Sequence, residues 1–250
     1  MEIDYMRLSG KSVIVTGAGR GIGRAIAIAY AREGAGVCLA ARTESQIRLV
    51  AEEIEAAGGR AIAVPTDVAD WDSVQAMVGG AVNAFGGLDI AVLNAGVLLD
   101  GGRTLEESVI DDWRRTIEVN LIGAYLCAKA VIPPLKARGQ GKIIITGSGN
   151  GHHGRVRGSS YGASKAGLWM VTRILSEELL EDRIDVNEIV PGPVYTELAR
   201  ELVSDPATRF AASGEWAKQP EELVDVAMFL ATQPSPGPTG QSFSLLRRPL

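Results

Sequence analysis

Apolar runs alternate with amphipathic stretches along nearly the whole chain. Short runs such as 12–16 and 36–40 are almost entirely apolar, which is typical of strands buried on both faces of a parallel sheet. Between them, apolar residues recur every three to four positions, which is typical of helices that cover a sheet. The expected strands are 12–16, 36–40, 61–64, 88–93, 142–146, 184–190 and 241–245, and the expected helices are 22–29, 45–57, 70–85, 110–138, 160–181 and 221–231.

This alternation of strands and helices predicts an α/β fold. We expect a single-domain, doubly wound (Rossmann-type) seven-stranded parallel sheet with helices on both faces. The sequence has no internal repeat and no linker long enough to divide residues 1–250. Asp70 is an expected N-cap, Gly86 an expected helix stop, and Pro133 and Pro134 are expected to break the 110–138 helix.

Composition narrows the class of protein. The 250 residues are 46% hydrophobic and 22% charged, which excludes a disordered chain. A net charge of −5 argues against nonspecific binding to nucleic acid, and we found neither a signal peptide nor an apolar run long enough to span a membrane. Cys38 and Cys127 lie in apolar stretches, so we expect buried free thiols and a cytoplasmic protein. Two cysteines and two adjacent histidines do not predict a metal site.

The glycine total of 30 is the one compositional excess, and its first cluster follows the first expected strand. Residues 16–23 read TGAGRGIG and open the first helix, with glycines at Gly17, Gly21 and Gly23 beside Ile22. Glycines here allow a tight turn and let a pyrophosphate approach the helix N-terminus. A tight connection alone would also use glycine, but the strand and helix around this turn favour dinucleotide binding.

A second constellation carries acid–base chemistry. Tyr161 and Lys165 are four residues apart, so on a helix they share one face. A nearby ammonium lowers the phenol pKa from its usual value of about 10, which favours proton transfer. This pair alone is common on ordinary helices, but Ser148 lies 13 residues earlier in a glycine-rich loop, and Asn120 lies within an expected helix.

With these motifs the chain resembles the short-chain dehydrogenase/reductase family over about residues 8–245. The resemblance implies that Ser148 binds a substrate carbonyl or hydroxyl and that Tyr161 is the acid/base. It implies that Lys165 binds the nicotinamide ribose and assists Tyr161, and that Asn120 interrupts its helix to support a relay water. The implied reaction is reversible hydride transfer that interconverts a ketone or 3-oxo group and a secondary alcohol.

The cofactor expected from this resemblance is NADP(H), with NAD(H) as the less favoured alternative. An acid at the end of the second strand binds the ribose 2′-hydroxyl in related folds, but here Arg42 and Thr43 follow that strand, and Arg20 lies in the glycine turn. The alternative interpretation is that Arg20 and Arg42 are ordinary solvated surface residues. The expected cofactor-binding residues are Gly17, Arg20, Gly21, Ile22, Gly23, Arg42, Thr43, Asp67, Val68, Asn94, Ala95, Gly96, Tyr161, Lys165, Pro191, Gly192, Val194 and Thr196.

Two of these assignments have structural alternatives, and two neighbours depart from the family pattern. Asp67 is also suited to capping a loop, and Asn94 to stabilising the sheet as much as to contacting a cofactor. Leu93 and Gly147 replace an Asn and a Ser that are common in relatives. We also expect many glycines to gather at the carboxyl edge of the sheet.

Substrate choice is expected in the loops 97–103, 149–158 and 194–218, the last as a lid. A 3-oxoacyl thioester and a sugar, polyol or small ketone remain alternative substrates, and a non-enzymatic NADP-binding regulator is the alternative function. The second loop contains four basic residues, which suit either a rim for an anionic substrate or a solvated basic loop. The solvated loop is the favoured interpretation of these residues, His152, His153, Arg155 and Arg157. The resemblance further implies a homotetramer or homodimer. The apolar and basic C-terminal tail would then reach a subunit interface.

Overall fold

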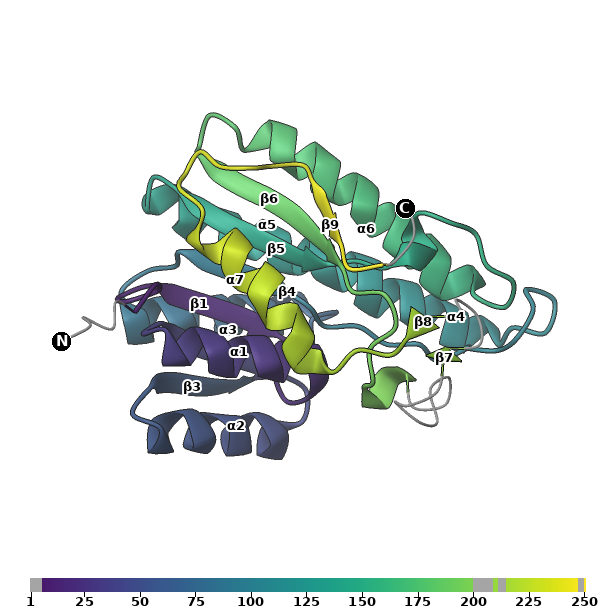
Figure 1. Ribbon diagram of the computed structural model, residues 1–250, viewed down its shortest axis with the longest axis horizontal. Coiled ribbons are helices and arrows are strands. Elements are labelled where there is room, and N and C mark those ends of the chain that lie inside the picture. The colour runs from purple at the N-terminus through teal and green to yellow at the C-terminus, as the bar shows by residue number, and fades with distance from the viewer. Residues whose placement is uncertain (1–5, 200–208, 211–214, 247–249) are drawn as a thin grey trace.

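The computed structural model describes residues 6–199, 209–210, 215–246 and 250 (Figure 1). Seven parallel strands form one sheet in the order β3-β2-β1-β4-β5-β6-β9, which confirms the predicted doubly wound topology. Their bounds are β1 Ser12–Thr16, β2 Gly36–Ala41, β3 Arg60–Pro65, β4 Ile90–Leu93, β5 Gly141–Thr146, β6 Ile184–Val190 and β9 Ser242–Ser244.

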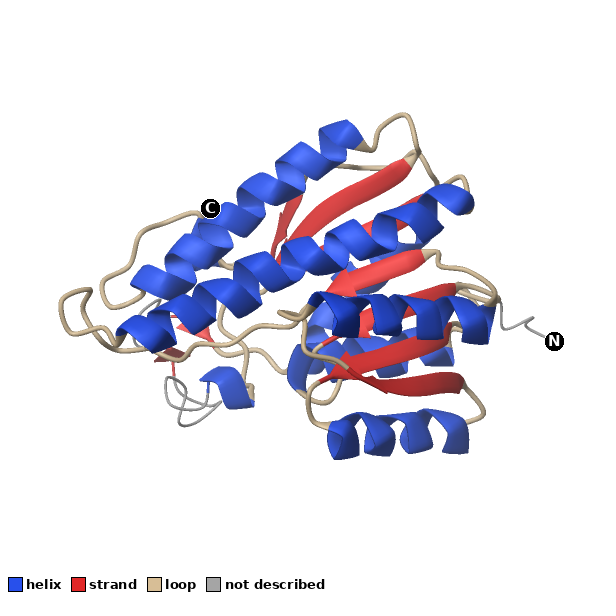
Figure 2. Cartoon of the chain, turned by 180° about the vertical axis from the view of Figure 1, so that it is seen from behind, coloured by secondary structure: helices blue, strands red, loops and turns tan. Residues whose placement is uncertain are grey.

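Helices cover both faces of this sheet. One face carries α1 (Gly21–Arg32), α2 (Glu44–Ala56) and α7 (Val224–Thr232). The other carries α3 (Trp71–Phe85), α5 (Gly123–Ala137) and α6 (Ser159–Glu178), with α4 (Ile110–Ile117) continuing into α5 (Figure 2). Shorter elements are η1 (Glu118–Ile122), η2 (Gly149–Gly151), η3 (Glu197–Ala199), η4 (Pro220–Leu223) and the antiparallel pair β7 (Arg209–Phe210) and β8 (Glu215–Trp216).

The helix ends follow the local sequence. Asp70 caps α3 by accepting a hydrogen bond from the Ser73 backbone N–H at 2.7 Å. Gly86 then ends the same helix in the left-handed region with φ 76°, which glycine adopts without a steric cost. Both residues act as the sequence predicted, so each end of α3 is set by a single residue.

The predicted break before Pro133 was wrong, because α5 continues through both prolines to Ala137. Pro133 and Pro134 remove only the hydrogen bonds to the carbonyls of Lys129 and Ala130, and the helix ends at Ala137, within one turn of Pro134. The whole helical stretch 110–137 has the length and composition of a membrane span, with a window of mean hydropathy 1.2, although no membrane span was expected from the sequence. In this fold its buried residues, including Cys127 and Val131, pack against the sheet as a core helix.

Candidate active site

A cavity of about 340 Å³ lies at the carboxyl edge of the sheet, where the loops after β1, β2, β3, β4, β5 and β6 meet. Every residue that the sequence predicted for catalysis or cofactor binding lines it, except Asn120 and Gly23. Seven glycines also line it, as expected from their positions in the sequence: Gly17, Gly19, Gly21, Gly96, Gly147, Gly149 and Gly192. The topology therefore gathers residues from six separate loops around one cavity.

The glycine turn between β1 and α1 has no room for side chains. A Cβ on Gly17, where φ is 68°, would lie 2.9 Å from Asn94 Nδ2. A Cβ on Gly23 would lie 2.4 Å from the carbonyl oxygen of Gly17. Gly23 therefore permits close packing of helix on strand instead of lining the cavity, while Gly17 and Gly21 leave the backbone open to a phosphate.

The basic residues predicted near a 2′-phosphate lie on the cavity wall together with carboxylates. Arg20 pairs with Glu197. Arg42 lies near Asp67, whose carboxylate also pairs with the Arg115 guanidinium at 2.8 Å. Burial alone would raise the pKa of Asp67, but hydrogen bonds from the Ala69 backbone and from Arg115 lower it. Neither Glu197 nor Arg115 was predicted as an ion-pair partner from the sequence, because each lies far along the chain from the residue that it pairs with.

Asn94 joins the ends of three strands. Its backbone N–H donates to Thr16 Oγ1 at 2.9 Å, and its side-chain amide donates to the Thr16 carbonyl at 3.1 Å. Its Oδ1 accepts from Thr146 Oγ1 at 3.1 Å. These bonds connect β1, β4 and β5, so Asn94 stabilises the sheet as well as lining the cavity.

Ser148, Tyr161 and Lys165 share one wall of the cavity. A side-chain hydrogen bond joins Ser148 to Tyr161. Lys165 is 3% exposed, donates from Nζ to the Thr146 carbonyl at 2.7 Å, and lies 5.7 Å from the centre of the Tyr161 ring. A serine from the β5 loop and a tyrosine and lysine from α6 thus meet beside the glycine turn.

The pKa values of this group differ from the sequence expectation. Burial raises the pKa of Tyr161 above its usual value, and only the hydrogen bond with Ser148 opposes this effect. Burial lowers the pKa of Lys165 to about 8, against the opposing effect of the Glu188 carboxylate. The lowering of the phenol pKa by Lys165 that the sequence predicts is not among the effects on Tyr161 in this structure, in which the Lys165 ammonium donates to the Thr146 carbonyl.

Asn120 lies in η1, a π-helical turn that interrupts the helix between α4 and α5. Its side chain is fully buried and exchanges two hydrogen bonds with the Val97 backbone, at 2.7 and 2.9 Å. It also donates to Ser164 Oγ at 3.2 Å. Asn120 therefore binds the loop after β4 to α6, next to Lys165, and its part in a water relay stays a prediction.

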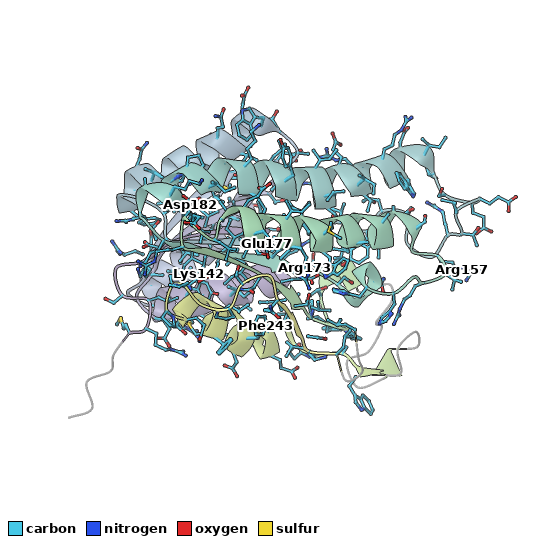
Figure 3. All side chains as sticks on the ribbon, turned by 90° about the horizontal axis from the view of Figure 1, so that it is seen from above. Lys142, Arg157, Arg173, Glu177, Asp182 and Phe243 are labelled. Carbon is cyan, nitrogen blue, oxygen red and sulfur yellow. The ribbon has the colours of Figure 1, made fainter. Side chains whose placement is uncertain are left out.

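The loop after β5 separates into buried and exposed parts. The His152 side chain is 9% exposed and contacts Glu188 Oε2 at 3.1 Å, so it is not the solvated residue that we expected. Arg155 lines the cavity, whereas Arg157 is exposed near the outer tip of the loop that precedes α6 (Figure 3). Sequence reasoning missed Glu188, and the only available signal was a carboxylate within an expected buried strand.

Comparison with known proteins identifies this arrangement. The sequence model of the short chain dehydrogenase family matches residues 11–207 of this chain. The chain belongs to the short-chain dehydrogenase/reductase family. The structure superposes with a TM-score of 0.86 on the crystal structure of a short-chain type dehydrogenase/reductase from Mycobacterium marinum. The two sequences are 33% identical, and the superposition covers 97% of this chain and 96% of the other chain.

Two curated relatives of this short-chain dehydrogenase/reductase illustrate its range. A 3-oxoacyl-[acyl-carrier-protein] reductase from Synechocystis sp. is 35% identical, covering 95% of this chain and 96% of the relative. A cis-4-hydroxycyclohexanecarboxylate dehydrogenase from Sinomonas cyclohexanicum is 38% identical and covers 88% of each chain. The protein is therefore an oxidoreductase of a family that acts on CH–OH groups of small molecules with a nicotinamide cofactor.

The cavity of this short-chain dehydrogenase/reductase suits such a cofactor. A side chain at Gly17 or Gly21 would crowd the glycine turn. This turn lies at the N-terminus of α1, where a pyrophosphate is favoured. A Cβ on Gly21 would lie 3.2 Å from Thr196 Cγ2, so the loop after β6 closes over the turn. The predicted lid 194–218 is described only in part, and its residues 200–208 and 211–214 lie outside the described residues.

Proposed function

We propose that this protein is an NADP(H)-dependent oxidoreductase that reversibly reduces a ketone or 3-oxo group to a secondary alcohol. One observation carries the proposal: Ser148, Tyr161 and Lys165 line the same cavity as the glycine turn. A purely regulatory NADP-binding protein would have no need of this acid–base set. The family membership supports the enzymatic alternative as well.

Each residue of the set has a role in the reductive direction. Ser148 and Tyr161 donate hydrogen bonds to the carbonyl oxygen, and Tyr161 then transfers its proton to the developing alkoxide. Lys165 binds the nicotinamide ribose and stabilises the phenolate that Tyr161 leaves behind. The bound cofactor supplies the hydride, so the protein contributes position and electrostatics.

The choice of NADP(H) rests on the end of β2. Arg42 and Thr43 line the cavity there, and no carboxylate follows β2 directly. Arg42 supplies a planar guanidinium for a 2′-phosphate. Arg20 is a second donor, and we propose that it exchanges its pairing with Glu197 for the phosphate when NADP(H) binds.

The substrate class is proposed from the relatives and the cavity together. The two relatives described above are named for a 3-oxoacyl group on an acyl carrier protein and for a hydroxylated cyclohexanecarboxylate. Arg155 on the cavity wall is suited to a carboxylate or another anionic group. A panel of 3-oxoacyl thioesters, cyclic hydroxy acids, sugars, polyols and small ketones, followed by NADPH absorbance, will separate the alternatives.

The proposal includes the organisation of the molecule. We propose that residues 1–250 form one catalytic domain and that 194–218 act as a lid, since Thr196 and Leu198 line the cavity. We propose a cytoplasmic homotetramer, with a homodimer as the alternative. The free thiols of Cys38 and Cys127, both buried, support a reducing compartment.

The test is the Tyr161→Phe variant. Removing the hydroxyl takes away the transferred proton but keeps the ring, so turnover should fall about 10²- to 10⁴-fold while NADPH binding persists. Turnover is measured with the best substrate of the panel and binding by fluorescence titration. Tyr125→Phe is the matched control, because Tyr125 is 47% exposed on α5 and does not line the cavity, and it should retain turnover. Unchanged turnover in Tyr161→Phe would refute the mechanism.

A further inference from the structure

A buried carboxylate lies behind the catalytic group. Glu188 in β6 is 1% exposed, and it shares a strand face with Val186, which packs in the same core as Leu168 of α6. Among the described residues, four buried side-chain atoms lack a hydrogen-bond partner, and three of them are Glu188 Oε1, Trp169 Nε1 and Arg173 Nη1. Unpartnered polar atoms thus concentrate between β6 and α6.

These residues form a connected cluster. Glu188 Oε2 contacts His152 Nε2 at 3.1 Å and accepts a hydrogen bond from Ser242 Oγ of β9. Arg173 donates to the same Ser242 Oγ at 3.0 Å, and Figure 3 shows Arg173 close to β9. Trp169 lies between the side chains of His152 and Arg173, with its ring 5.3 Å from that of His152 and 5.1 Å from the Arg173 guanidinium.

The cluster adjoins the catalytic residues on two sides. A Cβ on Gly147, the residue before Ser148, would lie 1.7 Å from Glu188 Oε1, so the carboxylate lies directly against the backbone that carries the serine. On α6, Lys165, Trp169 and Arg173 follow one another at intervals of four residues, so they form one row along the helix. Glu188 therefore faces the helix row that begins with the catalytic lysine.

A carboxylate at this place has an electrostatic consequence. Lys165 is almost completely buried, and burial disfavours its charged form. The Glu188 carboxylate acts in the opposite direction and raises the pKa of Lys165. The other titratable or charged groups that face this pair are Tyr161 and Arg173 from α6 and His152 from the loop after β5.

Glu188 Oε2 has two partners, but the buried Oε1 has none, so hydrogen bonding offsets only part of the cost of burying this carboxylate. An apolar side chain of similar size would fill the space between β6 and α6 without an unpartnered oxygen. We propose that Glu188 is a positioning residue that holds Lys165 in its ammonium form, the form that assists Tyr161. This inference rests on the proposed role of Lys165 in catalysis, but its test needs no substrate.

The test follows Lys165 itself by NMR. The protein is labelled with [13Cε]lysine, the Lys165 signal is assigned by its loss in Lys165→Gln, and its titration is followed from pH 6 to 10. We expect a midpoint near 8 in the wild type, and a midpoint lower by about one pH unit in Glu188→Gln. Glu188→Met, which needs no hydrogen-bond partner, should show the same shift. The alkaline limb of the pH–rate profile should move with it.

Two controls separate the carboxylate from its surroundings. His152→Gln keeps a hydrogen-bond donor beside Glu188. Glu178→Gln removes an exposed carboxylate from α6, the helix that carries Lys165. Both variants should leave the titration midpoint of Lys165 unchanged. An unchanged midpoint in the two Glu188 variants would overturn the proposal, as would an equal shift in His152→Gln. Failure of both Glu188 variants to fold would also overturn it, by making the carboxylate a structural requirement. If the wild type lacked turnover while the midpoint shifted as expected, only the proposed function would fail.

Discussion

Arg42 is the side chain on which the proposed cofactor preference depends most directly. It lines the cavity just beyond β2, whereas Arg20 is engaged with Glu197. The neighbouring carboxylate of Asp67 already has the Arg115 guanidinium as its ion-pair partner. Arg42 is therefore the residue whose loss should separate the two nicotinamide cofactors.

The variant Arg42→Ala should raise the KM for NADPH about 10- to 100-fold and leave the KM for NADH nearly unchanged. A hydrogen bond to a charged group contributes about 1.5–3 kcal/mol, and each 1.4 kcal/mol is a factor of about ten. Steady-state kinetics with both cofactors measure the ratio. Arg48→Ala is the control, because Arg48 is exposed on α2 and pairs with Glu44. A wild-type preference for NADH would contradict the assignment of both cavity arginines.

The end of β5 is held by packing that allows only glycine before Ser148. A Cβ on Gly147 would collide with Glu188 Oε1 at 1.7 Å, so Gly147→Ala should lower the free energy of unfolding by about 1–3 kcal/mol. The loss should be smaller when Glu188→Ala is present as well, because the colliding atom is then gone. Denaturant unfolding of the single and double variants measures this coupling.

Gly154→Ala provides the matched control in the following loop, since no atom lies within 4 Å of its added Cβ. It should change stability by no more than about 0.5 kcal/mol. Equal destabilisation by Gly147→Ala with and without Glu188 would show that strain comes from the backbone and not from the carboxylate. The contact between position 147 and Glu188 would then not be what restricts this position to glycine.

The sequence predicted the elements that local patterns determine. The predicted strand 184–190 has the same bounds as β6, Asp70 and Gly86 bound α3, and Ser148, Tyr161 and Lys165 meet at one cavity. Strand and helix signals arise from neighbouring residues, and parallel topology places strand ends at one edge. Most of the cavity wall could therefore be predicted from the sequence.

The sequence could not predict contacts that depend on distant partners. The His152 side chain is only 9% exposed and contacts Glu188, 36 residues further along the chain, so a loop that reads as basic and solvated is partly enclosed. The pKa of Tyr161 likewise depends on how deeply α6 is packed, not on its spacing from Lys165. Charge pairing and burial are properties of the tertiary structure, and single-residue motifs carry no information on them.

Large apolar side chains are exposed on the outer helices α5 and α6. Figure 2 shows α5 and α6 side by side on one face. Tyr125 of α5 is 47% exposed, and Met170 and Ile174 of α6 are 47% and 49% exposed. These residues offer a surface on which a second copy could pack helix against helix, which agrees with the proposed homotetramer.

Ile174→Glu should therefore break the assembly into smaller species while leaving the monomer folded. A charge buried at a helix interface lacks a partner there, and the buried isoleucine otherwise contributes about 1.5–3 kcal/mol at each copy of the interface. Light scattering coupled to gel filtration measures the mass, and circular dichroism confirms the fold. Leu49→Glu is the control, since Leu49 is 65% exposed on α2, away from this face, and should leave the mass unchanged. A monomeric wild type, or a tetramer that persists with glutamate at position 174, would refute assembly through α5 and α6.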